Sequence, residues 1–527
     1  RIDEFFARLE ARKSQLPAYH GELYLEYHRG TFTTHGDVKA AFRDVERALQ
    51  VHEAARCARG GKPIDPAPWH RIVFAQFHDY IPGSSIHEVY AEGKAEHAAL
   101  AESARRQARL ELSEKKGGEA LFNPLPYARL CWHDGRQLRL PPLAGGPVSD
   151  LPAVDPTPVQ ATANRLTSDR VDARFDARGR LTALVVDGVA TPFTGPANEL
   201  WLYPDQPHRF EAWDIDRQAL SCGQADVRPA EATVFSRGPG RAGVAFVRPL
   251  GKRSQVVIRY ALEAGQSTLG IEYDIDWQEE ATLLKAVFPT AFTGRDARFG
   301  SPFGSVRRPQ LAGALDAEAM WEVPMSRWCS VTDDAESEGF FLVTEAKYGA
   351  TCRQGVLGLS LLRSALITSE DRGARAGAHP EPIRRTLSPN RYADVGRHRI
   401  AVAVGRFDPA APRAVQPAAL AELLFTPPLV YQGGPVSCGL LGLEGGESLQ
   451  PVWAKPETDG AWVLRLHETL GRRGEVHLLA EPGWRLMRVD LSGNPMKALK
   501  QGRLAFRPYE VVSVRWSRAA AGKRVKT

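Results

Sequence analysis

The sequence predicts an α+β protein whose helices and strands form separate domains: an N-terminal bundle of three to four helices, followed by large all-β sandwich domains. Two observations predict this. Apolar residues recur at three- and four-residue steps in the first 116 residues, which is the helical period. After residues 115–118, Lys-Lys-Gly-Gly, those stripes vanish, and short β-branched or aromatic runs alternate with turn residues. The predicted domains are therefore 1–116 (helical bundle), 117–410 (large β-sandwich) and 411–527 (C-terminal β-domain).

Four helical stripes are expected in the first domain. They are Ile2, Phe5, Phe6 and Leu9; Val38, Phe42, Val45 and Leu49; Trp69, Ile72, Val73 and Phe77; and the long segment 86–112, rich in Ala, Glu and Arg. Thr33 and Thr34 are candidate caps for the second helix, and Ser85 with Glu88 has the spacing of a capping box for the fourth. Stripes of this kind pack against one another, which predicts the bundle.

Between the first two helices, residues 21–34 alternate in polarity. Leu23, Leu25 and Tyr27 would share one face of an extended segment that ends in a turn at Gly30. From the residues alone, we predict a half-buried strand with a solvated polar face.

The second half reads as strands. Residues 269–277 alternate apolar and polar side chains, as in a strand with one buried and one solvated face. Similar runs occupy 256–262, 340–343, 400–404, 462–466 and 511–516. Their number exceeds one sandwich, so a large sandwich with smaller ones is expected.

Composition excludes several functional classes. With 527 residues, 25% charged and 43% hydrophobic, the chain has ordinary globular values and no apolar run of some eighteen residues, so no membrane partner is expected. The net charge of +6 comes from scattered residues, which argues against nucleic acid. Six separated cysteines form no CxxC pair, which favours a reducing compartment, and we expect a cytoplasmic location. The chain opens on Arg1, without an initiator Met, so we expect its natural N-terminus to lie upstream.

The candidate site lies at the end of the third stripe. Pro82-Gly83 should stop that helix, which would place His78 and Asp79 on its last turn, with their side chains projecting from the helix end. From the residues alone, the commoner interpretation is an imidazole that complements the helix dipole beside a solvated carboxylate.

Two motifs resemble one family. Residues 76–90, Gln-Phe-His-Asp-x-x-Pro-Gly-Ser-Ser-Ile-x-x-Val-Tyr, are similar to a signature of the α-mannosidases of glycoside hydrolase family 38, and residues 21–34 are similar to a second stretch of that family. The resemblance continues to the end of the chain, through residues 121–125, 198–215, 322–328, 347–349, 361–364 and 507–510. Residues 365–390 depart from the family pattern, and no role is assigned to them.

The resemblance implies a retaining, zinc-dependent α-mannosidase that hydrolyses terminal α-mannosides. In that family two histidines and two aspartates bind zinc, and one of the aspartates is the nucleophile. The carry-over makes His78 a zinc ligand, and makes Asp79, His28 and Arg29 substrate contacts, with residues 20–34 leading out of the catalytic domain. The family places the remaining ligands on an N-terminal barrel-like domain, and no matching motif precedes Gly21. We therefore expect no catalytic nucleophile in this chain and negligible turnover by the chain alone.

Other polar residues are expected to have structural roles. His133-Asp134 and His52-Glu53 are expected to be solvated pairs that cannot replace the missing ligands. For Arg363 and Tyr348, structural hydrogen bonds are expected in preference to sugar contacts. A buried aromatic anchor is the commoner use of a residue such as Trp213.

Two alternatives remain open. The chain could be a non-catalytic β-sandwich module for carbohydrate binding or assembly, which would bind mannose or a partner without zinc. It could also be a lyase-like or other sugar-processing enzyme with its own carboxylate pair. The expected partner is an α-mannoside, and the sequence leaves linkage preference and a homo-oligomer open.

Overall fold

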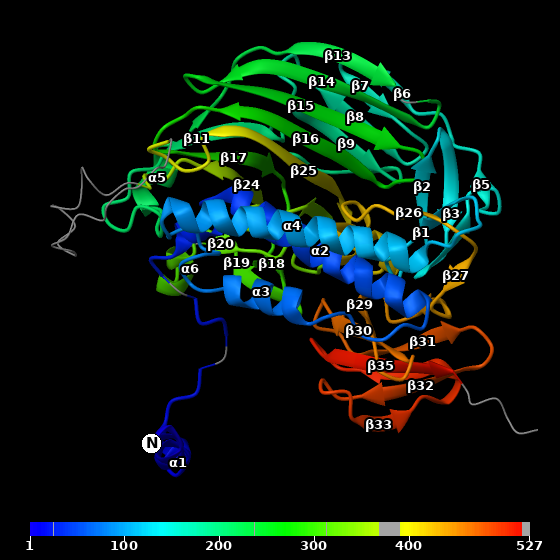
Figure 1. Ribbon diagram of the computed structural model, residues 1–527. Helices are drawn as coiled ribbons and strands as arrows, with labels where there is room; N and C mark the ends of the chain where they lie inside the picture. Colours follow the sequence, from blue (N-terminus) through cyan, green and yellow to red (C-terminus); the bar gives the residue numbers. More distant parts are fainter. Residues whose placement is uncertain (20, 25, 237, 312, 368–389, 519–527) are drawn as a thin grey trace, which may run out of the picture.

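The computed structural model describes residues 1–19, 21–24, 26–236, 238–311, 313–367 and 390–518. Within these ranges the long helices are gathered near the N-terminus and strands fill most of the rest (Figure 1), so the predicted fold class is confirmed. Most of residues 365–390 lie outside the described ranges. None of the described helices combines the length and the apolar composition that crossing a bilayer requires.

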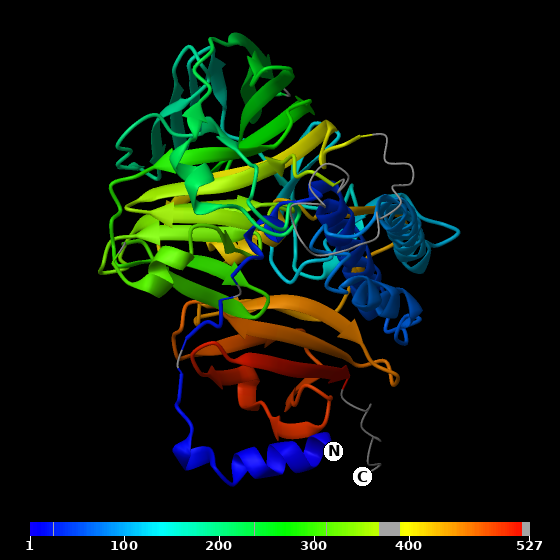
Figure 2. The ribbon, with the colours of Figure 1, turned by 90° about the vertical axis from the view of Figure 1, so that its left-hand side faces the viewer.

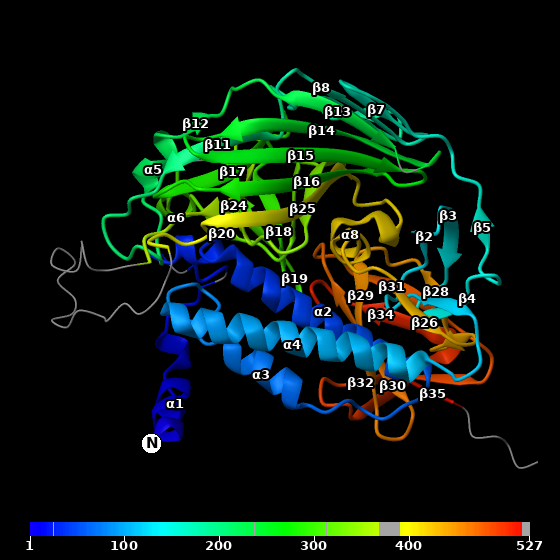
Figure 3. The same cartoon turned by 45° about the horizontal axis from the view of Figure 1, so that its top comes forward.

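The helical part contains α1 (Ile2–Glu10), α2 (Gly36–Ala58), α3 (Ala67–Ala75) and α4 (His87–Leu112), with two short 3-10 turns, η1 (Lys13–Gln15) and η2 (Arg29–Phe32). Helices α2 and α4 lie along one another and α3 lies beside them (Figure 3). Their shared core includes Val38, Phe42, Val45, Leu49, Ile72, Tyr90 and Ala101. Three helices thus form the bundle.

Helix α1 does not join that bundle. It lies away from the other helices (Figure 1), and Ile2, Phe5 and Phe6 are 76%, 59% and 60% exposed. The first predicted stripe is therefore a helix, but its apolar face has no partner among the described residues.

Both predicted helix caps are wrong. The N-cap of α2 is His35, in the left-handed region at φ 54°, and the Thr34 hydroxyl donates instead to the carbonyls of Gly30 and Ala212. The N-cap of α4 is Ile86, and neither helix has a side-chain capping bond. At the start of α2, a tertiary contact with the Ala212 carbonyl thus uses the hydroxyl that the capping pattern assigned to the helix end.

The strand predicted at residues 21–28 is also wrong. None of its described residues, 21–24 and 26–28, lies in a strand, and Leu23 is 85% exposed. The residues on either side of Leu23 make the contacts. The Tyr24 hydroxyl donates to the Glu322 carbonyl at 2.5 Å, and Glu22 pairs with Arg308 at 2.6 Å. An alternating pattern cannot show which face is buried when the partner surface is polar.

Three antiparallel sheets build the large β-region around one core. The nine-stranded sheet runs in the order β13 (Glu231–Ser236), β14 (Arg241–Leu250), β15 (Ser254–Glu263), β16 (Thr268–Trp277), β25 (Gly396–Phe407), β22 (Gly339–Thr344), β21 (Trp328–Thr332), β18 (Asp296–Ser301) and β19 (Gly304–Pro309). The six-stranded sheet runs β12 (Gln224–Ala225), β11 (Glu199–Pro204), β17 (Thr282–Pro289), β24 (Val356–Arg363), β23 (Gly349–Arg353) and β20 (Val323–Pro324). The five-stranded sheet runs β10 (Val189–Ala190), β9 (Leu181–Val186), β8 (Val171–Phe175), β7 (Arg165–Thr167) and β6 (Gln160–Thr162).

The strand predicted at residues 269–277 is confirmed as β16, and its alternate residues Leu269, Ile271, Tyr273, Ile275 and Trp277 are buried in this core. Two short helices, α5 (Arg217–Ser221) and α6 (Leu315–Ala319), lie near one end of the large sheets (Figure 1).

Smaller sheets complete the fold. A four-stranded sheet joins β26 (Leu429–Gln432), β1 (Glu119–Phe122), β4 (Ala144–Pro147) and β27 (Val436–Ser437), so it pairs strands from either side of position 410. A three-stranded sheet joins β2 (Arg129–His133), β3 (Arg136–Leu140) and β5 (Ala153–Val154). Helix α8 (Pro417–Leu423) follows the 3-10 turn η3 (Arg413–Val415).

The C-terminal strands, orange to red, lie below the large sheets (Figure 2). One sheet joins β28 (Leu440–Glu444), β31 (Gly474–Ala480) and β34 (Arg503–Phe506); the other joins β29 (Leu449–Pro456), β30 (Trp462–Glu468), β35 (Val511–Arg518), β32 (Trp484–Val489) and β33 (Pro495–Ala498), with η4 (Lys500–Gly502) before β34. Their core includes residues of α2, α4 and β1.

Candidate functional site

His78 lies in the turns between α3 and α4. Its predicted place on the last helical turn is wrong, because α3 ends at Ala75 and His78 follows it. Its side chain is 70% exposed, and its Nε2 lies 3.6 Å from Asp79 Oδ2. The Asp79 side chain is 43% exposed, and its Oδ1 accepts a hydrogen bond from the Ser84 hydroxyl at 3.2 Å. The loop therefore presents an imidazole and a carboxylate side by side at the surface.

Two buried side chains, Tyr90 and Lys39, form hydrogen bonds to the backbone of this loop. The Tyr90 hydroxyl donates to the Asp79 carbonyl at 3.1 Å and accepts the backbone N–H of Ser85 at 2.5 Å. The Lys39 ammonium donates to the carbonyls of Ile81 at 2.9 Å and Thr34 at 2.5 Å. Burial lowers the pKa of Lys39 to about 7, and burial raises the pKa of Tyr90 above its usual range.

Gly83 brings the loop against the start of α2. Its φ is +95°, and a Cβ there would stand 2.7 Å from the Thr34 carbonyl oxygen. Only glycine adopts this conformation at low cost in so small a space. The loop that carries His78 is thus fixed to the segment that carries His28.

That segment holds the other two predicted substrate contacts. The His28 ring lies edge-on to the Trp213 ring, with centroids 4.9 Å apart, and its Nδ1 lies 2.6 Å from the Glu26 carbonyl oxygen. Arg29 is only 1% exposed: its guanidinium donates to Asp214 at 3.2 Å and lies over the Trp321 ring at 3.5 Å. A sugar contact by His28 or Arg29 stays a prediction, and for Arg29 the burial of the side chain favours a structural role.

Arg363, the last residue of β24, organises the surroundings. Its fully buried guanidinium pairs with Asp205 at 2.7 Å and donates to the Thr34 hydroxyl at 2.7 Å. It also donates to the carbonyls of Glu211 and Ala212 at 2.9 and 3.0 Å. These are structural hydrogen bonds, as the sequence favoured for Arg363. Sequence reasoning missed its partners because they lie 151 to 329 residues away along the chain.

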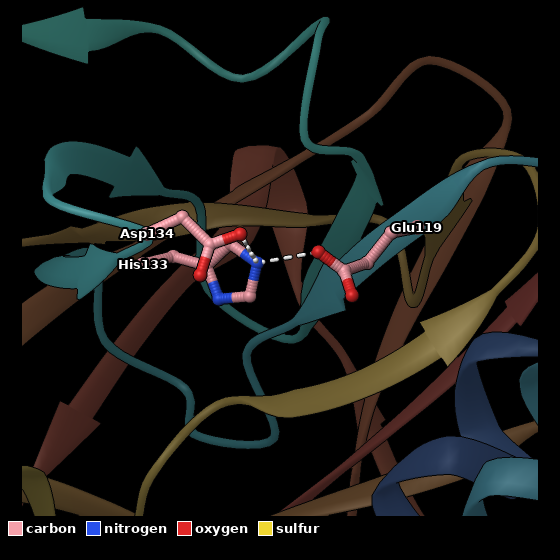
Figure 4. A group of neighbouring side chains, drawn as sticks. All are labelled: Glu119, His133 and Asp134. Carbon is pink, nitrogen blue, oxygen red and sulfur yellow. Dashed lines mark hydrogen bonds and ion pairs between the residues drawn. The ribbon is translucent and has the colours of Figure 1, made fainter.

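A second group of ligand-type side chains lies elsewhere. His133, on β2, places its Nε2 2.7 Å from Glu119 Oε1 of β1 and 3.7 Å from Asp134 Oδ2 (Figure 4). The Asp134 side chain is 84% exposed, and the His133 ring is hydrogen-bonded to Glu119. Among the described residues, this cluster is the one group with three potential ligands, and His78 is outside it.

The solvated pair expected at His52-Glu53 is wrong. Both side chains are buried, at 8% and 3% exposure, because α2 packs against the C-terminal sheets as well as against α4. The Trp69 indole N–H donates to Glu53 at 3.2 Å, and burial raises the pKa of Glu53 to about 7.

Two family descriptions match parts of this chain. Residues 166–370 match the glycosyl hydrolases family 38 C-terminal domain, and residues 26–113 match the alpha mannosidase middle domain. The first match covers much of the large β-region, and the second begins at the His28 segment and covers the three-helix bundle.

Two mammalian proteins are similar in sequence to larger parts of this chain. Alpha-mannosidase 2C1 of Homo sapiens is 26% identical over 556 residues, which cover 97% of this chain and 52% of that protein. Alpha-mannosidase 2C1 of Mus musculus is 28% identical, over 76% of this chain and 40% of that protein. The chain thus spans about half the length, or less, of these relatives. A solved structure of a glycosyl hydrolase family 38 protein from Enterococcus faecalis shares the fold, with a TM-score of 0.73 at 14% identity over 97% of this chain and 73% of that one.

Proposed function

Because the chain contains the middle and C-terminal domains of the glycosyl hydrolase family 38 α-mannosidases, we propose that it is the carboxy-terminal part of a retaining, metal-dependent α-mannosidase. In this proposal it supplies one zinc ligand, His78, and part of the wall of the site for a terminal α-mannoside. The observation that carries the proposal is the loop between α3 and α4, which holds an exposed imidazole and carboxylate on a buried scaffold.

The residues present could supply one ligand of a zinc site. Zinc takes imidazole nitrogen and carboxylate oxygen and needs three or four protein ligands. His78 offers an exposed imidazole, and the described residues bring no pair of further ligands to it. The metal would therefore be shared with a domain outside this sequence. When bound, it would supply electrostatic stabilisation of charge that develops at the sugar.

The chain's own residues would bind and orient. The Asp79 carboxylate, oriented by the Ser84 hydroxyl, can accept hydrogen bonds from sugar hydroxyls. His28, held against Trp213, would form the neighbouring wall. Arg29 would act as a positioning residue, since its ion pair with Asp214 fixes the backbone of the His28 segment.

Hydrolysis with retention also needs a general acid and a carboxylate nucleophile about 5 to 5.5 Å apart. We assign both to the domain outside this sequence. Exposed apolar side chains beside the site support a protein neighbour there: Val73, Phe74 and Phe77 are 64%, 71% and 57% exposed. Adjacent apolar residues on the surface are typical of a face that packs against further protein.

The test is the pair of variants His78→Ala and His70→Ala in a longer protein that includes the upstream domain. His70 is an exposed histidine of α3 and serves as the matched control. The His78 variant should lose bound zinc and lose more than about a hundredfold in kcat/KM for an aryl α-mannoside, since a ligand contributes at least as much as its supporting groups. The control should keep both.

Full zinc content and full activity in His78→Ala would reject the proposal. Mannose binding by the chain without zinc, unaffected by His78→Ala, would favour the non-catalytic module instead. The 527-residue chain alone should show negligible turnover, and measurable hydrolysis by it would contradict the assignment of the nucleophile to another domain.

A further inference from the structure

A cleft of about 690 Å³ opens where the helical bundle, the large sheets and the C-terminal sheet meet. One wall is a single face of α2, because Lys39, Arg43, Glu46 and Gln50 recur at steps of four, three and four residues. The other walls include the turn between β18 and β19 and the strand β29. Clefts of this size at the junction of domains are the usual place for a small ligand.

Aromatic rings surround the cleft. Trp69 of α3 and Trp453 of β29 pack together, with ring centroids 5.4 Å apart, and both are only partly buried. Phe303, in the turn between β18 and β19, is 57% exposed although it lines the cleft. Partly exposed aromatic rings in a concave site offer flat apolar surface, which suits the C–H faces of a pyranose ring.

The charged groups of the cleft all have partners within the protein. Glu422 lies between Arg43, at 2.6 Å, and Arg327, at 2.5 Å, and Glu46 lies 3.6 Å from Arg43. The Lys39 ammonium is engaged by backbone carbonyls. Arg465 donates to the carbonyl of Leu491 at 3.4 Å. The four cations of the lining are thus engaged within the protein, two by Glu422 and two by backbone carbonyls, and the neutral hydrogen-bonding groups are the ones left for a ligand.

Uncommitted polar groups remain for a neutral ligand. Among the residues that the structure describes, the Tyr348 hydroxyl and the Gln50 amide have no hydrogen-bond partner, and both line the cleft. Together they offer donors and acceptors for hydroxyl groups. Aromatic surface with neutral hydrogen-bonding groups is the chemistry that recognises a sugar.

We propose that this cleft is a second carbohydrate site, which binds a neutral oligosaccharide. Gln76, Ile81 and Pro82 contribute to its lining, while His78 and Asp79 of the same loop do not, so the proposed metal ligand is not part of the cleft. The choice of α-linked mannose as the sugar rests on the proposed function. The site itself rests on the cleft.

The experiment titrates the 527-residue chain with α-linked mannotriose, followed by calorimetry and by saturation-transfer NMR. The test variants are Phe303→Ala and Gln50→Ala, which alter an exposed ring and a half-exposed amide and leave the core intact. The matched control is Phe5→Ala, which removes a 59% exposed phenylalanine of α1 outside the cleft. We expect binding in the millimolar range that each test variant weakens at least fivefold and the control leaves unchanged.

The proposal is overturned by the absence of saturation transfer from the chain to mannotriose, or by binding that Phe303→Ala and Gln50→Ala leave unchanged. Tighter binding of inorganic phosphate than of mannotriose would also overturn it. His78→Ala separates the two proposals. Mannotriose binding that persists in this variant supports the cleft whether or not the longer protein needs zinc, whereas a failed zinc test with intact cleft binding rejects only the proposed function.

Discussion

Arg363 shows how one side chain can hold a surface site together without reaching it. Its guanidinium joins β24 to the start of α2 and to the backbone of residues 211–214. A planar guanidinium with five donors can satisfy several acceptors at once, which lysine cannot do. The rigidity of the His28 segment therefore depends on a residue far from it in sequence.

Arg363→Ala should accordingly destabilise the protein by about 3 to 5 kcal/mol, because it leaves buried Asp205 and several carbonyls without donors. Urea unfolding measures this. Arg397→Ala is the control: its side chain is 79% exposed and pairs with Asp274 at the surface, so a change below about 1 kcal/mol is expected. Equal effects of the two substitutions would contradict the structural role of Arg363.

Glu53 provides a pH-dependent test at the same scale. Burial raises its folded pKa to about 7 from an ordinary 4.5, so the folded state keeps a proton that the unfolded chain releases between those values. The free energy of unfolding then falls as pH rises from about 4.5 to 7, by about 3 kcal/mol at most. The Glu53→Gln variant should not lose this unfolding free energy, because an amide does not titrate in this range.

We therefore expect Glu53→Gln to match the parent chain at pH 4.5 and to exceed its unfolding free energy at pH 8. Urea unfolding at the two pH values checks this. Glu102→Gln, at an exposed position of α4, should differ by less than about 0.5 kcal/mol at either pH. If the unfolding free energy of Glu53→Gln differs from that of the parent chain by the same amount at both pH values, the Glu53 carboxyl is not the source of the pH dependence.

At the scale of elements, the loop after α3 depends on Gly83. Gly83→Ala places a methyl group against the Thr34 carbonyl oxygen in a left-handed conformation, so we expect a loss of about 2 to 3 kcal/mol. Hydrogen exchange of residues 79–86 should also accelerate. Gly118→Ala is the matched control, since a Cβ there meets no atom within 4 Å.

Long segments with a regular apolar pattern were predictable from the sequence as helices or strands, but the residues at which they begin and end were not. The stripes of α2 and α4 and the alternation of β16 were recognised because each packs an apolar face on an apolar core. The caps were missed because Thr34 bonds to Gly30 and Ala212 instead of to its helix. The same limit hid the scaffold of the site: His78 and Asp79 stand in a local motif, whereas Lys39 reads as an ordinary solvated position of a helix.

At the scale of the whole molecule, the four-stranded sheet makes the N- and C-terminal thirds interdependent. Strands β1 and β4 pair with β26 and β27, and buried Arg43 of α2 pairs with Glu422 of α8. A chain cut after residue 410 would leave two strand edges unpaired and would remove Glu422, the nearer of the two carboxylates beside Arg43.

Such a chain, residues 1–410, should therefore be insoluble or unfolded by circular dichroism. A chain cut after Arg518 retains every described element and should unfold like the parent. A soluble, cooperatively folded 1–410 fragment would show that the C-terminal third is an independent addition.

The spacing of these contacts also orders events during biosynthesis. Arg363 is added 329 residues after Thr34, which at about 5 to 20 residues per second is a delay of roughly 16 to 66 s. During that interval the nascent segment that carries His28 lacks the guanidinium that fixes it. The segment that carries His28, although it is translated 329 residues ahead of Arg363, therefore becomes rigid only after β24 has been synthesised and has packed against it.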